Sequence, residues 1–545
     1  MQSEASRILP KGGWDDIART FRWTVPDDFT IHDRCNTRWA NADPDRTAIV
    51  DLSGDGKRRV WTHGELKSAS DRLATALRDW GVGKGDRVGV LLPQSAEVIV
   101  AHFAAMKVGA IVVPLFVLFG EEALSFRLRD SGAKVVVTDD DGVGKLSELK
   151  AGLPDLVRVV TAGEAKNAER LADVISAFQP LIEPVPLRAD DPAVLIYTSG
   201  TTGPPKGALH AHRYLIGHLP CVELTLEGFP ATGDVCWTPA DWAWIGALMD
   251  LAMPCLYYGL PLVAFRFEKF DPERAWELIV DEGVSASFLP PTALKLMRQV
   301  EVPKAHRLRA INSGGESLAT DLIDWASGEV GATLNELYGQ TECNLVVASC
   351  EGKGVWRAAK IGRAVPGHRV AVINSSGKEV PAGEVGEIAV MRPDPVMFLG
   401  YWNQPEKTAE KFVGDWMKTG DLGQMDEDGY LAFVSRDDDV ITSAGYRIGP
   451  TEIENCLIGD PDVVMAAVIG VPDIERTEIV KAFVVLRDGA STDGIEAGLI
   501  ARVRERVSPH MAPRVVEVVD ELPMTVTGKI MRRALRDAEQ LKGAD

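Results

Sequence analysis

The chain has 545 residues, of which 46% are hydrophobic and 25% charged, and its formal net charge is −20. This length predicts several core-bearing units, and the composition excludes collagen-like, fibrous and disordered classes. The acidic balance disfavours nucleic acid and anionic membranes as partners. The seven cysteines include no Cys-X-X-Cys pair, so we expect reduced thiols and neither disulfides nor a zinc site.

The sequence contains no obvious targeting or membrane segment. Its first residues lack the apolar core of a secretory signal peptide. The most apolar window, Val108–Phe119, contains Pro114 and is too short to cross a bilayer. We therefore expect a soluble, cytoplasmic protein.

Runs rich in Val and Ile alternate with helical patterns over the first 350 residues. Such alternation predicts parallel sheets covered by helices on both faces, with ligands beyond the carboxyl ends of the strands. The predicted strands are Asp86–Pro93, Ala110–Pro114, Lys134–Thr138, Ala193–Tyr197, Pro261–Arg266 and Ser285–Pro290. The predicted helices are Ser95–Gly109, Glu121–Gly132 and Asp271–Glu282.

The pattern changes at about Ile361 to short strands separated by Gly and Pro turns. We expect an α/β fold: a large N-terminal domain, residues 1–435, with doubly wound parallel sheets (about 1–350) plus a small β-barrel-like subdomain (about 360–435). A small mobile C-terminal α+β domain should follow over 440–545, with two long strands around a turn at Gly470–Asp473. A charged run at Arg436–Asp439 marks the boundary and the expected hinge, 436–439.

A loop rich in Gly and hydroxyl residues follows the strand Ala193–Tyr197. Its glycines allow close approach of the backbone to a phosphate, its hydroxyls can donate hydrogen bonds, and Lys206 supplies positive charge. It differs from the GxxxxGK[ST] loop because no Ser or Thr follows Lys206. We expect these residues to bind phosphate: Thr198, Ser199, Gly200, Thr201, Thr202, Gly203 and Lys206.

This loop resembles the signature motif of the adenylate-forming superfamily, which comprises acyl-CoA synthetases, luciferases and the adenylation domains of peptide synthetases. Other segments resemble further motifs of that family, in the same order: Tyr338–Glu342, Trp416–Asp421, Ser435–Asp439, Ser443–Gly449 and Pro523–Lys529. The resemblance covers nearly the whole chain and is greatest to short- and medium-chain acyl-CoA synthetases. It implies ATP, CoA and a carboxylic acid as substrates and Mg²⁺ as cofactor.

The resemblance also implies individual roles. Glu342, with Thr201, is expected to bind Mg²⁺, and Thr341 to lie near the α-phosphate. Lys529 would be the mobile catalytic lysine that bridges the substrate carboxylate and the α-phosphate. Asp421 would bind the ribose hydroxyls; on local grounds alone, the less favoured alternative is an ordinary turn residue. The remaining ATP-binding residues are expected to be Gly315, Glu316, Glu336, Leu337, Tyr338, Gly339, Gln340 and Arg436.

The C-terminal motifs imply a conformational change between two half-reactions. Asp438 is the expected hinge, and Arg447 is expected to face the phosphate or the substrate carboxylate. Gly445 would let the pantetheine arm pass close to the backbone. The family usually has Gly where this chain has Thr477. The expected CoA-binding residues are Ser443, Ala444, Gly445 and Arg476.

Gly339 is the main clue to the acid, because acetate-specific relatives carry tryptophan at the matching position. Extra room there would favour short- to medium-chain acids, at about 0.8 kcal/mol per buried methylene. Trp244, in the segment Trp237–Gly246, is expected to form a pocket wall, although Trp242 and Trp244 fit equally well as core aromatics. Gly314 is expected on another wall. No basic residue marks a site for a second carboxylate.

Three functions stay open from the sequence. The first is an acyl-CoA ligase for a short- to medium-chain acid, branched acids included. The second is an aryl-CoA ligase or a free-standing adenylation enzyme that loads a carrier protein. The third is a non-catalytic nucleotide-binding protein or an ATPase, which would release ADP instead of AMP and pyrophosphate. Lys529 is also a candidate target of a lysine acetyltransferase and deacetylase, and assembly as a homo-oligomer is left open.

Overall fold

The computed structural model describes the chain except residues 1–6, 53–56, 182, 199–203, 317, 437–438, 444–445, 474–475, 488, 510, 525–529 and 543–545. Contacts divide it into two compact units, Met1–Arg369 with Met391–Asp415, and Val370–Val390 with Trp416–Asp545. Most of the expected β-barrel-like segment therefore groups with the C-terminal part of the chain. The hinge at 436–439 stays a prediction.

The first unit contains an eight-stranded sheet in the order β19-β9-β8-β4-β3-β5-β6-β7. Strands β8 to β7 of this path are parallel, whereas β9 and β19 are antiparallel to their neighbours. Its strands are β3 (Arg87–Leu91), β4 (Ile111–Pro114), β5 (Val135–Thr138), β6 (Arg158–Thr161), β7 (Glu169–Arg170), β8 (Pro192–Thr198), β9 (Lys206–Ala211) and β19 (Gly400–Tyr401).

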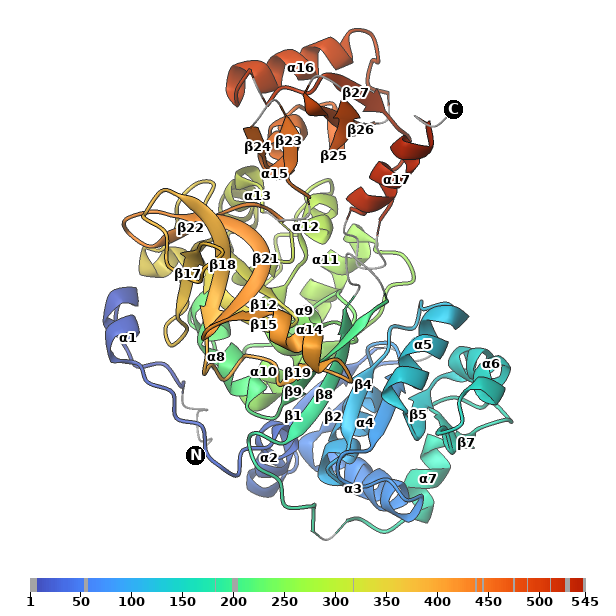
Figure 1. Ribbon diagram of the computed structural model, residues 1–545. Coiled ribbons are helices and arrows are strands. Elements are labelled where there is room, and N and C mark those ends of the chain that lie inside the picture. The colour runs from blue at the N-terminus through green and yellow to red at the C-terminus, as the bar shows by residue number, and fades with distance from the viewer. Residues whose placement is uncertain are drawn as a thin grey trace. The chain divides into compact units, whose positions relative to one another are not determined.

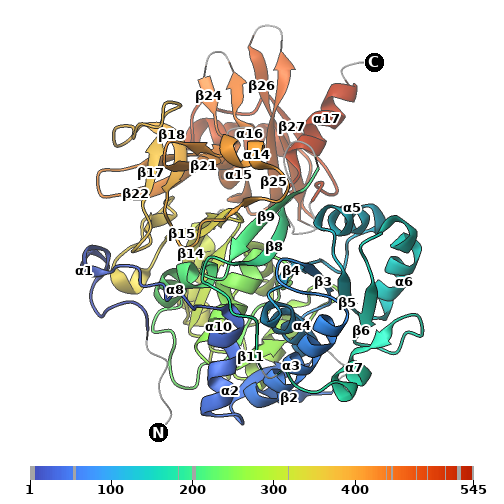
Figure 2. The ribbon, with the colours of Figure 1, turned by 60° about the horizontal axis from the view of Figure 1, so that its bottom comes forward.

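Helices cover this sheet in the doubly wound manner that the sequence predicts (Figures 1 and 2). Strands β4 and β5 lie on opposite sides of β3. Because parallel crossovers are right-handed, the connecting helices must lie on opposite faces of the sheet. These helices are α4 (Ala96–Lys107) and α5 (Glu121–Ser131).

A second sheet in the first unit follows the order β16-β15-β14-β13-β12-β10-β11-β1-β2. Its strands from β14 to β1 are parallel and its other strands are antiparallel. The strands are β1 (Thr47–Asp51), β2 (Arg59–Thr62), β10 (Cys236–Trp237), β11 (Leu262–Ala264), β12 (Ala286–Phe288), β13 (Ala310–Gly314), β14 (Thr333–Gln340), β15 (Cys343–Ala348) and β16 (Gly362–Ala364).

Helices with apolar faces complete the first unit. Helix α11 begins at an Asp271 cap, as the Asp-Pro pair predicts, and Trp276 of this helix packs in a core with Trp237 and Trp325. None of the helices in the described residues is long and apolar enough to cross a bilayer. The other helices are α1 (Trp14–Thr20), η1 (Asp33–Thr37), α2 (Arg38–Ala42), α3 (His63–Asp79), α6 (Asp140–Leu149), η2 (Lys150–Gly152), α7 (Leu171–Ala177), α8 (Tyr214–Thr225), α9 (Ile245–Ala247), η3 (Leu248–Ala252), α10 (Met253–Tyr257), α11 (Pro272–Asp281), α12 (Pro291–Met297), α13 (Thr320–Trp325), η4 (Ala326–Val330), η5 (Glu351–Lys353) and α14 (Pro405–Glu410).

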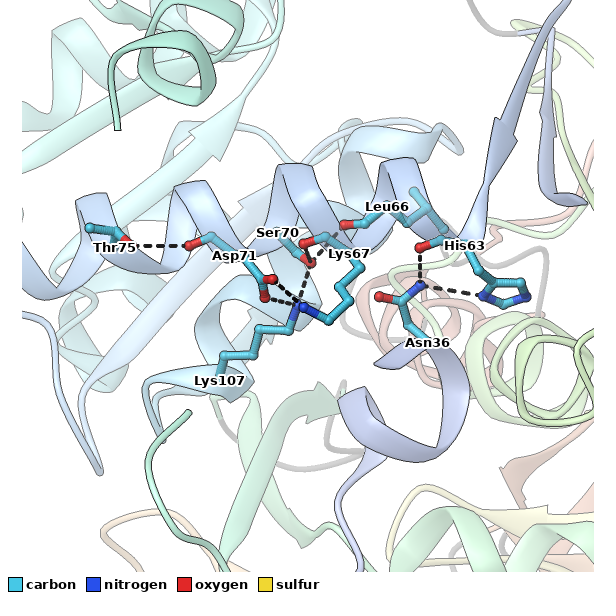
Figure 3. Close-up of polar contacts among 8 residues, drawn as sticks. All are labelled: Asn36, His63, Leu66, Lys67, Ser70, Asp71, Thr75 and Lys107. Carbon is cyan, nitrogen blue, oxygen red and sulfur yellow. Dashed lines mark hydrogen bonds and ion pairs between the residues drawn. The ribbon is translucent and has the colours of Figure 1, made fainter. Parts of the chain in front are cut away.

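A buried polar cluster joins α3 to α4 in the first unit (Figure 3). The Lys107 ammonium donates to Asp71 Oδ1 at 2.6 Å and to Ser70 Oγ at 2.7 Å. Lys67, one turn before Asp71, pairs with the other carboxylate oxygen at 2.7 Å. The Lys107 side chain is only 1% exposed. Burial, opposed by the charge and hydrogen bond of Asp71, lowers the pKa of Lys107 to about 8.

The second unit contains antiparallel strands and an α+β segment. One path of strands is β17-β18-β21-β22, and the other sheet is β24-β23-β26-β25 with β27 parallel to β26. Residues Gly470–Asp473, expected as a turn, are the end of the long strand β25. The elements are β17 (Val370–Ile373), β18 (Val385–Met391), β21 (Trp416–Met425), β22 (Tyr430–Arg436), β23 (Ile441–Ser443), β24 (Tyr446–Ile448), α15 (Pro450–Ile458), β25 (Val463–Asp473), β26 (Thr477–Leu486), α16 (Ile495–Arg506), β27 (Val515–Val518) and α17 (Arg532–Lys542).

Candidate active site

Strands β8 and β9 hold the two ends of the Gly-rich loop. Thr198, the last residue of β8, is the cross-strand partner of Lys206, the first residue of β9. The Thr198 hydroxyl also donates to the Lys206 carbonyl at 3.4 Å. Residues 199–203, which include the expected metal ligand Thr201, lie outside the described residues. Thr198 and Lys206, expected in the loop, are therefore strand residues at its two ends, and the phosphate contacts of the loop stay a prediction.

Tyr401 connects the loop lysine to Glu342. The short strand β19 pairs with β9 and places Tyr401 opposite Ala208. The Lys206 ammonium lies 5.2 Å from the centre of the Tyr401 ring, and the Tyr401 hydroxyl donates to Glu342 Oε1. Sequence reasoning missed Tyr401; the only signal was an aromatic pair in a short stretch between turns. Lys206, Tyr401 and Glu342 thus form one cluster from three distant segments of the chain.

Glu342 is a suitable single carboxylate ligand for a hard cation. Its side chain belongs to a residue that is 7% exposed, and within the described residues its Oε2 accepts no hydrogen bond. Burial and the charge of Glu342 raise the pKa of Tyr401, so this phenol stays a donor. The described residues include no group of three or more His, Cys, Asp or Glu suited to a metal. Mg²⁺ bound here would take its other ligands from phosphates and water, as Mg²⁺ often does.

Strand β14 carries the expected adenine and α-phosphate residues beside those of β13. The parallel register places Gly314 opposite Leu337, so the carboxyl ends of both strands meet. The Thr341 carbonyl accepts from the Tyr214 hydroxyl at 2.9 Å. Burial, opposed by a 3.3 Å hydrogen bond from the Leu318 amide, raises the pKa of Glu336 to about 8. The structure thus brings together the following predicted residues: Gly314, Gly315, Glu316, Glu336, Leu337, Tyr338, Gly339, Gln340, Thr341 and Glu342.

The backbone of Asn344 and Leu345 lies close to Gly339, and the expectation that this glycine leaves room for a longer acid stays a prediction. A Cβ at this position would lie 2.6 Å from Asn344 Cα and 2.7 Å from Asn344 Oδ1. The neighbouring β15 segment therefore packs directly against the Gly339 backbone. Glycine is required here by this close packing.

Trp244 belongs to a group of aromatic side chains. This placement fits both roles that the sequence allows, a wall of the acyl pocket and a residue of the core. Its ring lies 5.6 Å from that of Phe116 and 5.9 Å from that of Phe119, and it is partly exposed. Trp242 is 2% exposed and is a core residue. Of the two tryptophans, only Trp244 keeps a surface available for a ligand.

In the second unit, the expected ribose pair lies together. Asp421 on β21 is the cross-strand partner of Arg436 on β22. The Arg436 Nε lies 3.9 Å from Asp421 Oδ1, and the arginine side chain is 46% exposed. Asp421 is therefore more than an isolated turn residue, because it is paired with a cation on the neighbouring strand.

The structure describes only part of the predicted CoA and hinge residues. Ser443 is 6% exposed and pairs across strands with Thr477, and the Arg476 amide donates to Asp473 Oδ1 at 2.8 Å. Thr477 has φ +71°, a left-handed conformation that explains why glycine suits this position. The Arg447 side chain and these residues lie outside the described part of the chain: Asp438, Ala444, Gly445 and Lys529.

An ion-pair network that sequence reasoning missed involves residues that closely follow the predicted hinge and the predicted catalytic lysine in the sequence. Arg532 donates to Glu454 through two nitrogens, at 2.9 and 2.6 Å, and to Asp439 at 3.1 Å. Arg536 donates to Asp439 at 2.9 Å. Asp439 directly follows Asp438, and Arg532 lies three residues after Lys529. The network therefore links two residues, Asp439 and Arg532, that closely follow the predicted hinge and the predicted catalytic lysine in the sequence.

The combination of a Gly-rich loop sequence, a nearby carboxylate with an available oxygen and parallel sheets is typical of an enzyme that acts on nucleotide phosphates. The chain matches the family of AMP-binding enzymes over residues 36–402, and the C-terminal domain of AMP-binding enzymes over 452–529. It therefore belongs to the AMP-binding, adenylate-forming enzyme family, as its motifs predict.

Similar proteins are mainly acyl-CoA synthetases. The human "Acyl-coenzyme A synthetase ACSM4, mitochondrial" is 32% identical, with 98% of this chain and 92% of the relative covered. The acetyl-coenzyme A synthetase of Bacillus subtilis is 34% identical, with 88% and 86% covered. Among solved structures, the anthranilate CoA ligase AuaEII with anthranoyl-AMP has a TM-score of 0.88 and 27% identity, with 96% of this chain and 99% of that chain covered.

Proposed function

We propose that this protein is an ATP-dependent acyl-CoA ligase that acts on a short- to medium-chain carboxylic acid, branched acids included. In the first half-reaction, a carboxylate oxygen attacks the α-phosphorus of ATP, and pyrophosphate leaves. In the second, the CoA thiolate attacks the acyl carbon of the adenylate, and AMP leaves. The observation that carries the proposal is the Lys206–Tyr401–Glu342 cluster at the end of the Gly-rich loop.

The cluster suits the charge that develops in the first half-reaction. Mg²⁺, held by Glu342 and the ATP phosphates, would neutralise charge on the leaving pyrophosphate. Tyr401 occupies Glu342 Oε1 and leaves Oε2 available. The same phenol ring lies beside the Lys206 ammonium, which restricts where this cation can meet a phosphate. Tyr401 is therefore proposed to orient both groups.

A second candidate function is an aryl-CoA ligase. It is favoured by similar solved structures of aryl-CoA ligases, namely anthranilate CoA ligase and a benzoate CoA ligase from Burkholderia xenovorans. The aromatic group around Trp244 is compatible with a flat acid as well as with a branched one. Loading of a carrier protein and simple ATP hydrolysis are further outcomes of the test below.

The test is product analysis with Mg-ATP, CoA and a panel of aliphatic and aromatic acids. We expect acid-dependent release of AMP and pyrophosphate, formation of an acyl-CoA, and exchange of labelled pyrophosphate into ATP. Glu342→Gln should reduce exchange by about 10²-fold or more, because one charged ligand is lost. The matched variant Tyr401→Phe keeps the Glu342 carboxylate and should lose less pyrophosphate-exchange activity than Glu342→Gln. Release of ADP, or activity that is independent of acid, contradicts the proposal.

Lys529 is proposed to act in the adenylation step alone. Lys529→Ala should lower pyrophosphate exchange by about 10²- to 10³-fold, since one charged group that stabilises the transition state is removed. Thioester formation from supplied acyl-AMP and CoA should change much less. An equal loss in both half-reactions would contradict this role. Acetylation of Lys529 is proposed to silence adenylation in the same way, and Lys529→Gln with normal exchange would contradict that proposal.

A further inference from the structure

Three buried polar side chains lie between the two segments that implied the acyl site. Asp250 is 2% exposed, Asn344 5% and His218 0%. Asn344 Nδ2 donates to Asp250 Oδ1 at 2.6 Å and lies 3.2 Å from His218 Nε2. We call these residues the polar triad. Such a group is unusual where an apolar chain would bind, because burying polar groups costs free energy unless each is hydrogen-bonded.

The polar triad touches both acyl-site segments. A Cβ on Gly339 would lie 2.7 Å from Asn344 Oδ1, and a Cβ on Gly246 would lie 3.7 Å from Asp250 Oδ2. Gly246 ends the segment that contains Trp244. Asp250 itself lies in the π-helical turn η3 (Leu248–Ala252), a local geometry that is often found at functional sites. The triad therefore lies next to Gly339 at its Asn344 end and next to Gly246 at its Asp250 end.

The hydrogen bonds of the triad leave two side-chain oxygens unused, one on Asn344 and one on Asp250. The His218 ring nitrogen Nδ1 lies 2.8 Å from the Tyr214 carbonyl, so Nδ1 must carry the proton and Nε2 is left to accept. Asn344 then uses both amide hydrogens, one on His218 and one on Asp250 Oδ1. Within the described residues no donor reaches Asn344 Oδ1 or Asp250 Oδ2. Asn344 Oδ1 packs against Gly339, whereas Asp250 Oδ2 lies at the Gly246 end of the triad, where a ligand can complete it.

We propose that Asp250 Oδ2 binds a hydroxyl group on the acyl portion of the substrate, so that the preferred substrate is a hydroxy acid. This inference rests on the proposed acyl-CoA ligase function and narrows it to a substrate class. An unsubstituted alkyl or aryl acid would leave Oδ2 unpaired in a site that the acid has closed to water, which is unfavourable. A hydroxyl group can both donate and accept, and therefore matches either protonation state of the carboxyl.

The protonation states of the triad agree with this geometry. Burial, opposed by the hydrogen bond from Asn344, raises the pKa of Asp250 well above its ordinary range. Burial also lowers the pKa of His218 to about 3, so the imidazole is neutral. A neutral Asp250 donates from Oδ2, and a hydroxyl oxygen accepts. Two neutral partners suit a buried contact better than an ammonium or a second carboxylate on the acid.

The test compares matched pairs of acids by pyrophosphate exchange with the full-length protein. The pairs are hexanoate with its 4-, 5- and 6-hydroxy derivatives, and benzoate with the three hydroxybenzoates. A site built to hydrogen-bond a substrate hydroxyl discriminates strongly against the analogue without it. We expect at least one hydroxy acid to exceed its parent in kcat/KM by about 10²-fold or more.

Variants of Asp250 connect this preference to the triad. Asp250→Leu should remove the preference or invert it, since the apolar side chain pairs with the parent acid. Asp250→Asn keeps polar atoms and should retain part of the preference, which serves as a second test where the leucine variant fails to fold. Thr225→Val is the matched control, because Thr225 is also buried but its hydroxyl is already bonded to the Cys221 carbonyl at 2.9 Å. That variant should keep the wild-type ratio.

The outcomes separate this inference from the proposed function. Parent acids that are used as well as their hydroxy derivatives would overturn the hydroxyl site and leave the ligase activity standing. A preference that is unchanged in Asp250→Leu would also overturn it, because the triad would then be purely structural. Failure of every acid in the panel to support exchange would instead count against the ligase function itself.

Discussion

The first unit buries the Lys107 cation and the second holds the half-buried Arg532 cation, and the environments shift the two pKa values in opposite directions. In the first unit, burial outweighs the attraction of Asp71 and lowers the pKa of Lys107 to about 8. In the second unit, burial alone would lower the pKa of Arg532, but the charges and hydrogen bonds of Glu454 and Asp439 outweigh it and raise the pKa.

The difference follows from the number of partners and the shape of the cation. Lys107 has one carboxylate, and the neighbouring Lys67 opposes its charge. Arg532 has two carboxylates, and its planar guanidinium meets Glu454 through two parallel hydrogen bonds. The charge of the cation is therefore well compensated in the second unit and under-compensated in the first. Removing a partner should cost more where only one partner exists.

The largest effect is expected for Asp71→Asn. This change leaves the Lys107 ammonium buried without its carboxylate, and breaking a buried ion pair typically costs about 3–5 kcal/mol of unfolding free energy. Urea unfolding at pH 7 measures it. The control Lys67→Met removes a lysine whose side chain is 32% exposed and should cost less than about 1 kcal/mol. The double variant Asp71→Leu with Lys107→Met should recover most of the loss; if it does not, packing and not charge governs this site.

A smaller effect on stability is expected for Arg532→Lys, since a lysine keeps the charge but loses the parallel hydrogen bonds. Charge-assisted hydrogen bonds contribute about 1.5–3 kcal/mol, so the loss should lie within that range. We expect a second, functional signature because Arg532 flanks the Lys529 loop. Its ends are tied by the bridge between Met524 and Ile530.

Comparison of the half-reactions tests this positioning role. Pyrophosphate exchange should fall in Arg532→Lys more than thioester formation from acyl-AMP does. The control Arg533→Lys changes the adjacent residue, whose side chain is 61% exposed, and should alter neither. A variant that loses stability but keeps the ratio of the two half-reactions would show that Arg532 has only a structural role.

The sequence predicted the fold and the local motifs well, because both depend on short-range patterns. The strand–helix alternation located β3, α4, β4, α5 and β5 almost to the residue. Glu342 and Lys206 were identified from motifs and lie in one cluster. Tyr401 and Arg532 were missed, because their roles arise only when distant segments pair. The close contact of Asn344 with Gly339 could not be predicted for a related reason, since it is set by the packing of β15.

The smallest predicted effect is a change of the unfolding free energy with pH. It distinguishes Lys107 from Arg532 most directly. In the unfolded chain Lys107 titrates near 10.5, whereas in the folded protein its pKa is about 8. Between these values the unfolded state binds more protons, so stability should rise with pH, by about 1 kcal/mol from pH 8 to pH 9. Arg532 stays protonated throughout this window and should contribute nothing. The measurement is the difference in unfolding free energy between the wild type and Lys107→Met at both pH values, because other groups titrate alike in both proteins. A difference that does not change with pH would mean that Lys107 keeps an ordinary pKa, and that Asp71 compensates it as fully as Glu454 and Asp439 compensate Arg532.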